Sequence, residues 1–519
     1  MNIRDISWYL GVFLFVSGVL SFFPIPIALY YNEPVLLLLI RCLIFWFLGF
    51  IFMQYPRKKI SLGDAMLLVA ISMIIIPFFS AIPFFPELEG DPVDVLVDGY
   101  FESVSGYTTS GLTIFSEKQL NPESPSYKHS LIFSRTLMEW TGGLGIIILF
   151  LSLLASGGIS TVYLYRVEGR EERIVPSIDH TARIILRIYL FYTFAGAILL
   201  WILDMQPVYA LSTIMSVLST GGFISMVQGI HINALSEIVI LVFMLLAAIP
   251  FTLDYVLLSG NLRRFFGHLE IRFGCYLISI AILIFTIISL STGRDLLNSL
   301  YQSIIITIGS ITTGGYGESV LNDLNGPGIL LVMILMMIGG GAGSTAGGIK
   351  IVRIGVLFKA IRWLIRKSSL PETVVLPLKI DGGVFRDEEL RNIGLFFFAY
   401  IVLIFAGAFS LMMWGTTDNG EVELIDAFFL SMSAQSNVGF STLNIRIQSI
   451  IVKSIMIFQM IAGRLEIFPI LALVGYAIKG FEREVVEIER GIIEKKEKDR
   501  ELEERIKFLR RLRSIDKKR

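Results

Sequence analysis

The sequence predicts an all-α membrane protein in which four pseudo-repeats of helix, pore loop and helix surround one pore, plus an N-terminal transmembrane hairpin. Of the 519 residues, 54% are hydrophobic and the mean hydropathy is +0.71, which exceeds the apolar content of ordinary soluble domains. Apolar runs long enough to cross a bilayer recur along the chain. Four short polar loops, each with a glycine, separate pairs of these runs.

The four loops follow one pattern, in which a short apolar helix leads to a turn rich in Ser, Thr or Asn and then to Gly and a bulky residue. They span residues 108–112, 219–223, 310–317 and 437–440, with glycines at 111, 222, 315 and 439. A spacing of roughly a hundred residues accommodates two spanning helices and one re-entrant segment. Extended backbone at membrane depth is tolerated where it is buried in protein or lines a water-filled cavity. The loops are therefore candidate ion-coordinating segments.

Basic clusters and turns divide the chain into six segments. We predict an N-terminal transmembrane hairpin at 1–56, pore repeat 1 at 57–157, pore repeat 2 at 158–260, pore repeat 3 at 261–370, pore repeat 4 at 371–480, and a charged cytoplasmic helical tail at 481–519. The basic clusters, such as Arg57-Lys58-Lys59, all fall on one side of the predicted spans. The positive-inside rule then predicts a multi-pass protein of the cell membrane with both termini in the cytoplasm.

Within these segments the apolar runs predict ten spanning helices and four pore helices. The spanning helices are residues 6–30, 35–54, 62–85, a helix containing 135–145, 184–204, 235–258, 273–290, 328–365, 392–414 and 450–478. The pore helices are residues 93–104, 208–218, 296–308 and 423–434. Two of the predicted spanning helices contain residues that interrupt an α-helix. Pro250 predicts a kink, and a run of glycines at 339–348 should unwind its helix, since each Gly costs about 1 kcal/mol relative to Ala.

The loops have the composition of a cation filter. A dehydrated monovalent cation needs several oxygen ligands, and backbone carbonyls supply them without the tight binding of fixed carboxylates. Glycine permits the positive φ or close approach that turns carbonyls inward, and the carboxyl ends of pore helices add partial negative charge. The predicted filter residues are Thr109, Ser110, Gly111, Leu112, Thr220, Gly221, Gly222, Phe223, Thr313, Gly314, Gly315, Tyr316, Asn437, Val438, Gly439 and Phe440.

A cluster of acidic residues lies before and within the first pore helix. It holds Glu87, Glu89, Asp91, Asp94 and Asp98. These side chains either concentrate cations at the outer mouth of the pore or form a merely solvated acidic loop.

The chain resembles the potassium transporters of the Trk/Ktr/HKT superfamily, and specifically their TrkH-like membrane subunit. The resemblance covers residues 1 to about 480 and rests on four motifs: the single-glycine loops, residues 139–145 (Glu-Trp-Thr-Gly-Gly-Leu-Gly), residues 341–350 (Gly-Ala-Gly-Ser-Thr-Ala-Gly-Gly-Ile-Lys) and residues 463–466 (Gly-Arg-Leu-Glu). Together these motifs are highly specific. The tail at 481–519 lies outside the resemblance.

The resemblance implies a K⁺-selective membrane subunit for potassium uptake. K⁺ is the transported substrate, held at Thr109, Ser110, Thr220, Gly221, Thr313, Gly314, Asn437 and Val438. The implied gate is the glycine-rich loop, with gating residues Gly340, Gly341, Gly343, Ser344, Thr345, Gly347 and Arg464. The implied partners are a second copy of the chain in a homodimer, the lipid bilayer, and a cytoplasmic TrkA-like nucleotide-binding regulatory subunit.

Physical reasoning supports a special position for Arg464. An intramembrane Arg costs about 2.5–3.5 kcal/mol at a helix centre, so it is expected to face the pore or backbone carbonyls of the glycine-rich loop. Alternatively, Arg464 and Glu466 are ordinary anchors at the cytoplasmic end of their helix. Lys350 and Arg353 are predicted to be interfacial anchors.

Other functions lack the residues that they need. No metal spacing of histidines, Gly-x-Ser-x-Gly elbow or pair of intramembrane aspartates occurs, so we predict no enzyme and no organic cofactor. Residues 341–346 match a dinucleotide-binding pattern but interrupt an apolar helix instead of following a strand. A net charge of zero gives no basic field for nucleic acid.

The remaining alternative is a K⁺ symporter coupled to H⁺ or Na⁺, because broken helices near the midplane also mark ion sites in secondary transporters. Four repeats of one orientation, and loops that offer carbonyls instead of buried carboxylates, favour a pore.

Overall fold

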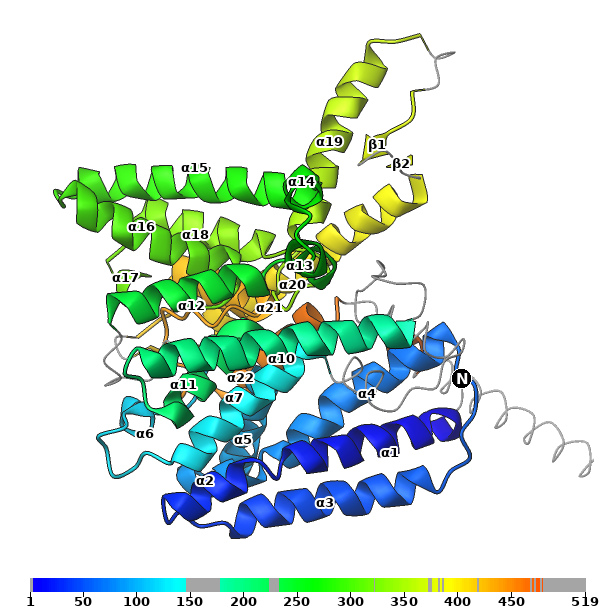
Figure 1. The fold of residues 1–519 in the computed structure, drawn as a ribbon, viewed down its shortest axis with the longest axis vertical. Coiled ribbons are helices and arrows are strands. Elements are labelled where there is room, and N and C mark those ends of the chain that lie inside the picture. The colour runs from blue at the N-terminus through cyan, green and yellow to red at the C-terminus, as the bar shows by residue number, and fades with distance from the viewer. Residues whose placement is uncertain are drawn as a thin grey trace, which may run out of the picture.

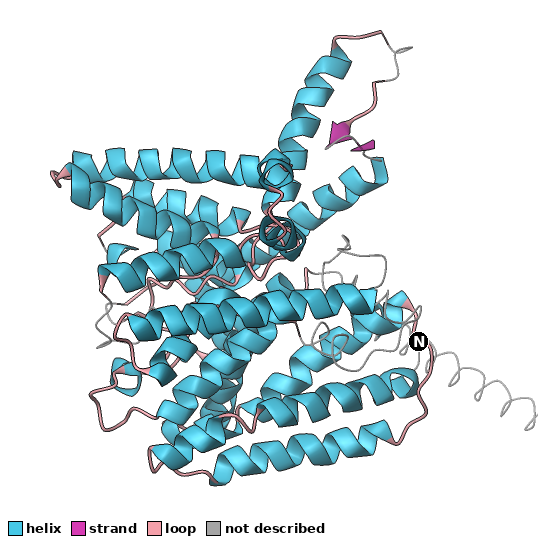
Figure 2. Cartoon of the chain, in the orientation of Figure 1, coloured by secondary structure: helices cyan, strands magenta, loops and turns pink. Residues whose placement is uncertain are grey.

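The computed structural model describes residues 3–145, 178–223, 233–321, 323–371, 376–380, 383–384, 387–417, 420–466, 469–470, 473–476 and 478. Within these ranges the chain folds into helices joined by loops, as predicted (Figure 2). One small exception is a two-stranded antiparallel ribbon of β1 (Lys379–Ile380) and β2 (Gly383–Val384). The predicted tail at 481–519 lies outside the described residues, as do residues 146–177.

The N-terminal residues form a helical hairpin. Its helices are α1 (Ile3–Leu20), α2 (Pro24–Tyr30) and α3 (Leu36–Met53), and α1 packs along α3 (Figure 1). Two glycines permit this contact, because a Cβ atom added at Gly11 would lie 2.8 Å from the carbonyl oxygen of Gly49. The helix predicted at 6–30 is interrupted by a turn before Pro24, which stands at the start of α2.

The rest of the described chain repeats an arrangement in which a short helix precedes a loop between longer helices. The first group is α4 (Leu62–Ser80), η1 (Ile82–Glu87), α5 (Pro92–Tyr107), α6 (Glu117–Leu120) and α7 (His129–Leu144). The second is α10 (Ile178–Ile202), α11 (Pro207–Ser219), α12 (Ala234–Ala247), α13 (Phe251–Leu258) and α14 (Leu262–Gly267). The third is α15 (Leu269–Ser291), α16 (Leu296–Ile311), α17 (Glu318–Leu321), α18 (Gly326–Ile338) and α19 (Ile351–Ser368). The fourth is α20 (Asp387–Trp414), α21 (Leu424–Ser436) and α22 (Ile450–Arg464).

Local sequence explains where several of these helices start. The side chains of Asn233, Asp295, Asn325 and Ser449 accept hydrogen bonds from backbone N–H groups in the first turns of α12, α16, α18 and α22. Such N-caps satisfy donors that have no partner inside the helix. The short helices α5 and α11 instead begin with a proline, which is favourable in the first turn.

Three further predicted spans are broken. The predicted kink at Pro250 is confirmed, since α12 and α13 meet there at an angle of 114°. The predicted break in the glycine-rich run is also confirmed, since α18 ends at Ile338 and α19 begins at Ile351. The predicted helix 450–478 is wrong as a single helix: α22 ends at Arg464, and Glu466 has a φ of 57°, which a continuous α-helix does not allow.

The described residues include six helices that are long and apolar enough to cross a membrane, or seven if the bent pair α12 and α13 is one span. The helices α7, α18 and α22 are shorter, with 16, 13 and 15 residues. The predicted total of ten spans therefore stays a prediction.

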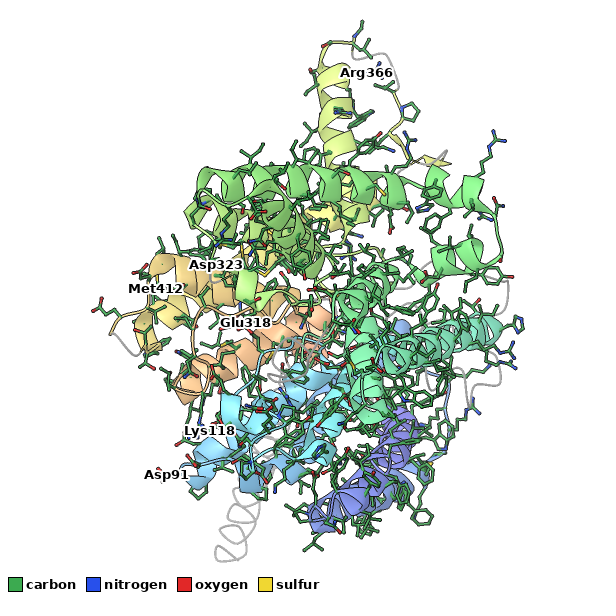
Figure 3. The ribbon with its side chains drawn as sticks, turned by 60° about the vertical axis from the view of Figure 1, so that its left-hand side comes forward. Asp91, Lys118, Glu318, Asp323, Arg366 and Met412 are labelled. Atoms are coloured by element: carbon green, nitrogen blue, oxygen red, sulfur yellow. The ribbon has the colours of Figure 1, made fainter. Side chains whose placement is uncertain are left out.

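The long helices run roughly side by side, whereas α19 projects from one edge of the bundle (Figure 1). Arg366 lies near the far end of α19, and the labelled charged residues Asp91, Lys118, Glu318 and Asp323 lie on the side of the molecule that holds α6 and α17 (Figure 3). The four short helices α5, α11, α16 and α21 end inside the bundle, where their final residues are buried.

Candidate cation-conducting site

Four loops follow the short helices α5, α11, α16 and α21, and their backbones repeat one conformation. We call them loop 1 (residues 108–112), loop 2 (219–223), loop 3 (310–317) and loop 4 (437–440). In each loop a non-glycine residue has a positive φ, namely Thr109, Thr220, Thr313 and Asn437, with φ of 55°, 53°, 57° and 55°. Two residues later a glycine also has a positive φ, at Gly111, Gly222, Gly315 and Gly439.

This repetition is evidence of a functional constraint. Threonine is β-branched, and a positive φ is a genuine outlier for such a residue. Strained backbone of this kind persists where the surrounding structure determines it, and it gathers at functional sites. Sequence reasoning selected these four positions for their polar side chains but missed the strain, because Thr carries no signal for a left-handed backbone.

The hydrogen bonds at the helix ends repeat as well. The residue after each strained position donates its N–H to a carbonyl five residues earlier: Ser110 to Ser105, Gly221 to Ser216, Gly314 to Gly309 and Val438 to Ser433, at 2.8, 3.0, 3.1 and 3.1 Å. This is the hydrogen bond of a Schellman helix end. This hydrogen bond ends each of the four short helices, and the backbone that follows has the same conformation in all four loops.

The four loops converge at their glycines. A Cβ atom added at Gly111 would lie 2.4 Å from the carbonyl oxygen of Gly221, and one added at Gly439 would lie 2.8 Å from that of Ser110. A Cβ atom added at Gly222 would lie 3.0 Å from the carbonyl oxygen of Val438 and 3.5 Å from the carbonyl oxygen of Gly314. One added at Gly315 would lie 2.3 Å from the carbonyl oxygen of Val438. Four carbonyl groups, one from each loop, thus lie against glycines of other loops.

The structure brings all sixteen predicted filter residues into these loops, and all of them except Tyr316 are buried. A larger side chain at Gly111, Gly315 or Gly439 would collide with the backbone of a neighbouring loop, and one at Gly222 would lie in tight contact with it, at 3.0 Å. The arrangement can offer backbone oxygens to a dehydrated cation at the centre of the bundle. Within the described residues, no group of His, Cys, Asp and Glu could hold a metal ion through side chains.

The acidic residues before and within α5 lie in different surroundings. Asp98 is buried and forms an ion pair of 2.6 Å with Lys453 on α22, and Glu89 pairs with Arg446 at 2.8 Å. These two carboxylates therefore join the first and fourth groups of helices, and the alternative of a merely solvated acidic loop is wrong for Asp98.

The glycine-rich segment 339–350 forms a compact loop between α18 and α19. Gly339 and Gly348 have φ of 71° and 76° and lie together, since a Cβ atom added at Gly339 would be 2.8 Å from the Cα atom of Gly348. The loop is hydrogen-bonded to the C-terminal end of α12. Gly341 donates its N–H to the carbonyl of Ala248 at 2.9 Å. The hydroxyl group of Thr345 donates to the carbonyl of Ala247, also at 2.9 Å.

The glycine-rich loop touches two of the converging loops directly. The N–H of Gly347 donates to Thr313 Oγ1 in loop 3 at 2.7 Å. A Cβ atom added at Gly347 would lie 2.0 Å from the carbonyl oxygen of Ser436, the residue before loop 4. The predicted gating residues Gly340, Gly341, Gly343, Ser344, Thr345 and Gly347 all belong to this loop.

Arg464 connects the same elements from the end of α22. It donates to the carbonyl of Thr345 at 2.8 Å, to Thr109 Oγ1 at 3.3 Å and to the carbonyl of Gly143 at 3.1 Å, and it also reaches the carbonyl of Gly142. The expected position of Arg464 beside the glycine-rich loop is confirmed. These contacts do not fit the alternative of an ordinary anchor, because all of them are to protein groups inside the bundle.

The neighbouring charges also differ from the prediction. Lys350 was expected to be an interfacial anchor, but it is buried and donates to the carbonyl of Ala346 in the glycine-rich loop. Arg353 forms an ion pair with Glu466, and its guanidinium lies over the ring of Phe396 at 4.4 Å. Lys350 and Arg353 were expected to be anchors because they lie near the end of a predicted spanning helix. The helix is interrupted before Ile351, and the side chain of Lys350 instead contacts the carbonyl of Ala346 in the glycine-rich loop.

The chain is similar to known cation transport proteins. Residues 81–478 match the TrkH family model, which is described as a cation transport protein. An uncharacterized cation transporter of Methanocaldococcus jannaschii is 29% identical over 476 residues, which cover 91% of this chain and 95% of that protein. The Trk system potassium uptake protein TrkH of Vibrio parahaemolyticus is 27% identical over 504 residues, which cover 91% of this chain and 98% of that protein.

The fold is shared with a solved structure. The crystal structure of the potassium transporter TrkH from Vibrio parahaemolyticus matches with a TM-score of 0.78 and 24% sequence identity, over 91% of this chain and 98% of that one. At this identity the match shows a common fold.

Proposed function

The chain belongs to the TrkH family of cation transport proteins, and we propose that it is the K⁺-conducting membrane subunit of a potassium-uptake system. It is a multi-pass membrane protein. The observation that carries the proposal is the convergence of loops 1 to 4, which sets four backbone carbonyls against glycines of neighbouring loops. Relatives named as potassium uptake proteins support K⁺ as the transported ion.

In this proposal the four loops form the selectivity filter. The carbonyl groups of Ser110, Gly221, Gly314 and Val438 replace part of the water shell of K⁺, together with oxygen atoms of Thr109, Thr220, Thr313 and Asn437. Neutral oxygens bind a monovalent cation weakly enough to release it, which conduction requires. The four pseudo-repeats, with boundaries at 57–157, 158–260, 261–370 and 371–480, then surround one pore after the hairpin at 1–56.

The glycine-rich loop acts as the gate in this proposal. Its hydrogen bonds to Thr313 and, through Arg464, to Thr109 support a position immediately beside the filter. A loop held by single hydrogen bonds can be displaced at modest cost, since each contributes about 1 kcal/mol. We place its control in a cytoplasmic TrkA-like nucleotide-binding partner and the protein itself in a homodimer, with both termini in the cytoplasm.

Uptake of ⁸⁶Rb⁺ tests the proposal. Proteoliposomes that contain this chain alone and are loaded with KCl are placed in ⁸⁶Rb⁺ with K⁺, Na⁺ or Cs⁺ as competitor. Accumulation driven by the K⁺ gradient alone, and inhibited better by K⁺ than by Na⁺, is the expected result. Uptake that appears only with an imposed H⁺ or Na⁺ gradient would replace the passive pore by a coupled symporter.

A further inference from the structure

A group of buried charged side chains lies behind loops 1 and 2 and has no part in the function described so far. Glu102 comes from α5, and Arg135 and Glu139 come from α7. All three are almost completely buried, with at most 1% of their surface exposed. Burying a charged group inside a membrane protein is costly, and such groups are usually paired and functional.

Glu102 and Arg135 hold the chain just beyond loop 1. Arg135 Nε lies 2.6 Å from Glu102 Oε1, and a second nitrogen of the guanidinium donates to Thr113 Oγ1 at 2.9 Å. Glu102 Oε2 accepts the backbone N–H of Ile114 at 3.0 Å. The residues that follow Leu112 of loop 1 are therefore fixed by a fully enclosed ion pair.

Arg135 and Glu139 hold loop 2 through one residue, Phe223. The guanidinium of Arg135 lies over the Phe223 ring, 3.9 Å from its centroid. Glu139 Oε1 accepts the backbone N–H of Phe223 at 3.1 Å. Arg135 and Glu139 are four residues apart on one helix and therefore project from the same face. Residues on adjacent turns of α7 therefore contact Phe223 twice, Arg135 at its ring and Glu139 at its backbone N–H.

Glu139 also supports the neighbouring residue of loop 2. A Cβ atom added at Gly221 would lie 2.3 Å from the carboxyl carbon of Glu139, so the carboxylate packs directly behind Gly221. Gly221 is the residue whose carbonyl oxygen faces Gly111 in loop 1. A displacement of Glu139 would therefore reach the gap between loops 1 and 2.

Loops 3 and 4 are supported by other chemistry. The hydroxyl of Tyr316 in loop 3 donates to Glu237 Oε1 at 3.2 Å, from the first turn of α12. The amide group of Asn437 in loop 4 donates to Ser110 Oγ at 2.6 Å and to the carbonyl of Met460 at 2.9 Å. Within the part of the chain that the structure describes, the enclosed ion pair of Glu102 and Arg135 therefore lies on the side of the site formed by loops 1 and 2.

We propose that Arg135 and Glu139 are positioning residues that hold Phe223, and with it loop 2, at the distance from loop 1 that discriminates K⁺ from Na⁺. The proposal rests on the filter proposed above. Selectivity that depends on the spacing of carbonyls needs loops that cannot relax around a smaller ion, and enclosed side chains with fixed hydrogen bonds supply that rigidity. Neither residue touches the ion in this role.

The test compares two substitutions of Glu139 in the full-length protein. Glu139→Met keeps the length of the side chain and removes the acceptor, whereas Glu139→Gln keeps an acceptor oxygen for the Phe223 N–H. Asp254→Leu is the matched control, because Asp254 is an equally buried carboxylate whose partner is the hydroxyl of Tyr192, at 3.3 Å. The readout is the ratio of the K⁺ and Na⁺ concentrations that halve ⁸⁶Rb⁺ uptake into proteoliposomes.

We expect Glu139→Met to reduce the K⁺ preference by about tenfold, the size of effect expected when the buried N–H of Phe223 is left without its acceptor. Rescue of the preference in Glu139→Gln and an unchanged ratio in Asp254→Leu complete the expected result. A Glu139→Met protein that remains as selective as the wild type would overturn the proposal. Absence of ⁸⁶Rb⁺ uptake by the wild type would instead contradict the proposed function.

A second variant covers the case in which Glu139→Met does not fold. Arg135→Lys keeps a positive charge for Glu102 but lacks the planar face that covers Phe223. It is expected to lower the K⁺ preference in the same direction. Wild-type selectivity in a folded Arg135→Lys protein would then decide against the proposal.

Discussion

Thr313 Oγ1 accepts a hydrogen bond of 2.7 Å from the backbone N–H of Gly347, so the third converging loop and the glycine-rich loop are directly joined. Because both residues are buried, water does not compete for this bond. The contact places the backbone of the proposed gate directly against a side chain of the proposed filter.

Thr313→Val removes the acceptor and keeps the branched shape. Loss of one hydrogen bond costs about 1 kcal/mol, so the closed position of the loop should become roughly fivefold less favoured. We expect faster ⁸⁶Rb⁺ uptake in proteoliposomes without any partner protein. Thr307→Val is the control, since Thr307 is buried on α16, the helix that leads into loop 3, and its hydroxyl has no hydrogen-bond partner within the described residues. Equal uptake by the Thr313 and Thr307 variants would contradict the prediction.

Gly315→Ser should weaken the discrimination between K⁺ and Na⁺. The new Cβ atom would lie 2.3 Å from the carbonyl oxygen of Val438, and a non-glycine residue at a φ of 59° adds strain of about 1–3 kcal/mol. Competition of Na⁺ with ⁸⁶Rb⁺ uptake measures the effect. Gly293→Ser, at another positive φ but with open space around it, is the matched control. Unchanged selectivity in Gly315→Ser would remove loop 3 from the filter.

Deletion of residues 341–347 should raise uptake in the absence of a partner. The deletion is structurally feasible because Gly339 and Gly348 already lie side by side. It removes Thr345 and Gly347, which bond to Arg464 and Thr313. The measurement is ⁸⁶Rb⁺ flux of purified protein that elutes as a single species in detergent. Flux at or below the wild-type level in such protein would argue against a gate in this loop.

Glu318→Gln should stabilise the protein near neutral pH. Burial raises the pKa of the Glu318 carboxyl above its ordinary value, and the nearby Glu117 raises it further. A raised folded-state pKa means that the folded protein binds more protons than the unfolded chain, so the stability contribution of this group is lost as pH rises through that pKa. The gain in unfolding temperature for Glu318→Gln should therefore be larger at pH 8 than at pH 4.5.

Glu421→Gln provides the comparison for this titration, because Glu421 is exposed. Its unfolding temperature should follow that of the wild type at both pH values. A Glu318→Gln protein whose gain is the same at both pH values would show that the carboxyl does not titrate differently in the folded state.

Local sequence signals predicted much of the fold. The glycine run at 339–348 and Pro250 broke their helices where backbone chemistry requires it, and the four glycine loops were found because each has its own local pattern. The end of α22 at Arg464 was missed because the largely apolar residues 465–478 were taken to continue the helix, although Pro469 is a stop signal.

Contacts across long sequence distances were the main omission. Arg135 appeared in the sequence only as part of a predicted helix and Glu139 only as the first residue of the motif 139–145, since their partners Glu102 and Phe223 lie on other elements. The ion pair of Asp98 with Lys453 joins residues 355 apart. Sequence periodicity and motif spacing relate residues that are close along the chain, so they could not predict these pairs. The pairs are seen only in the three-dimensional structure.

The hydrogen bond between Ser110 and Asn437 spans 327 residues, and it joins the first loop to the last. Because the chain is synthesised from its N-terminus, loops 1 to 3 enter the membrane before their fourth neighbour exists. In the proposed filter, loop 4 is therefore the last of the four loops to be made, and the hydrogen bond from Asn437 to Ser110 can form only after it.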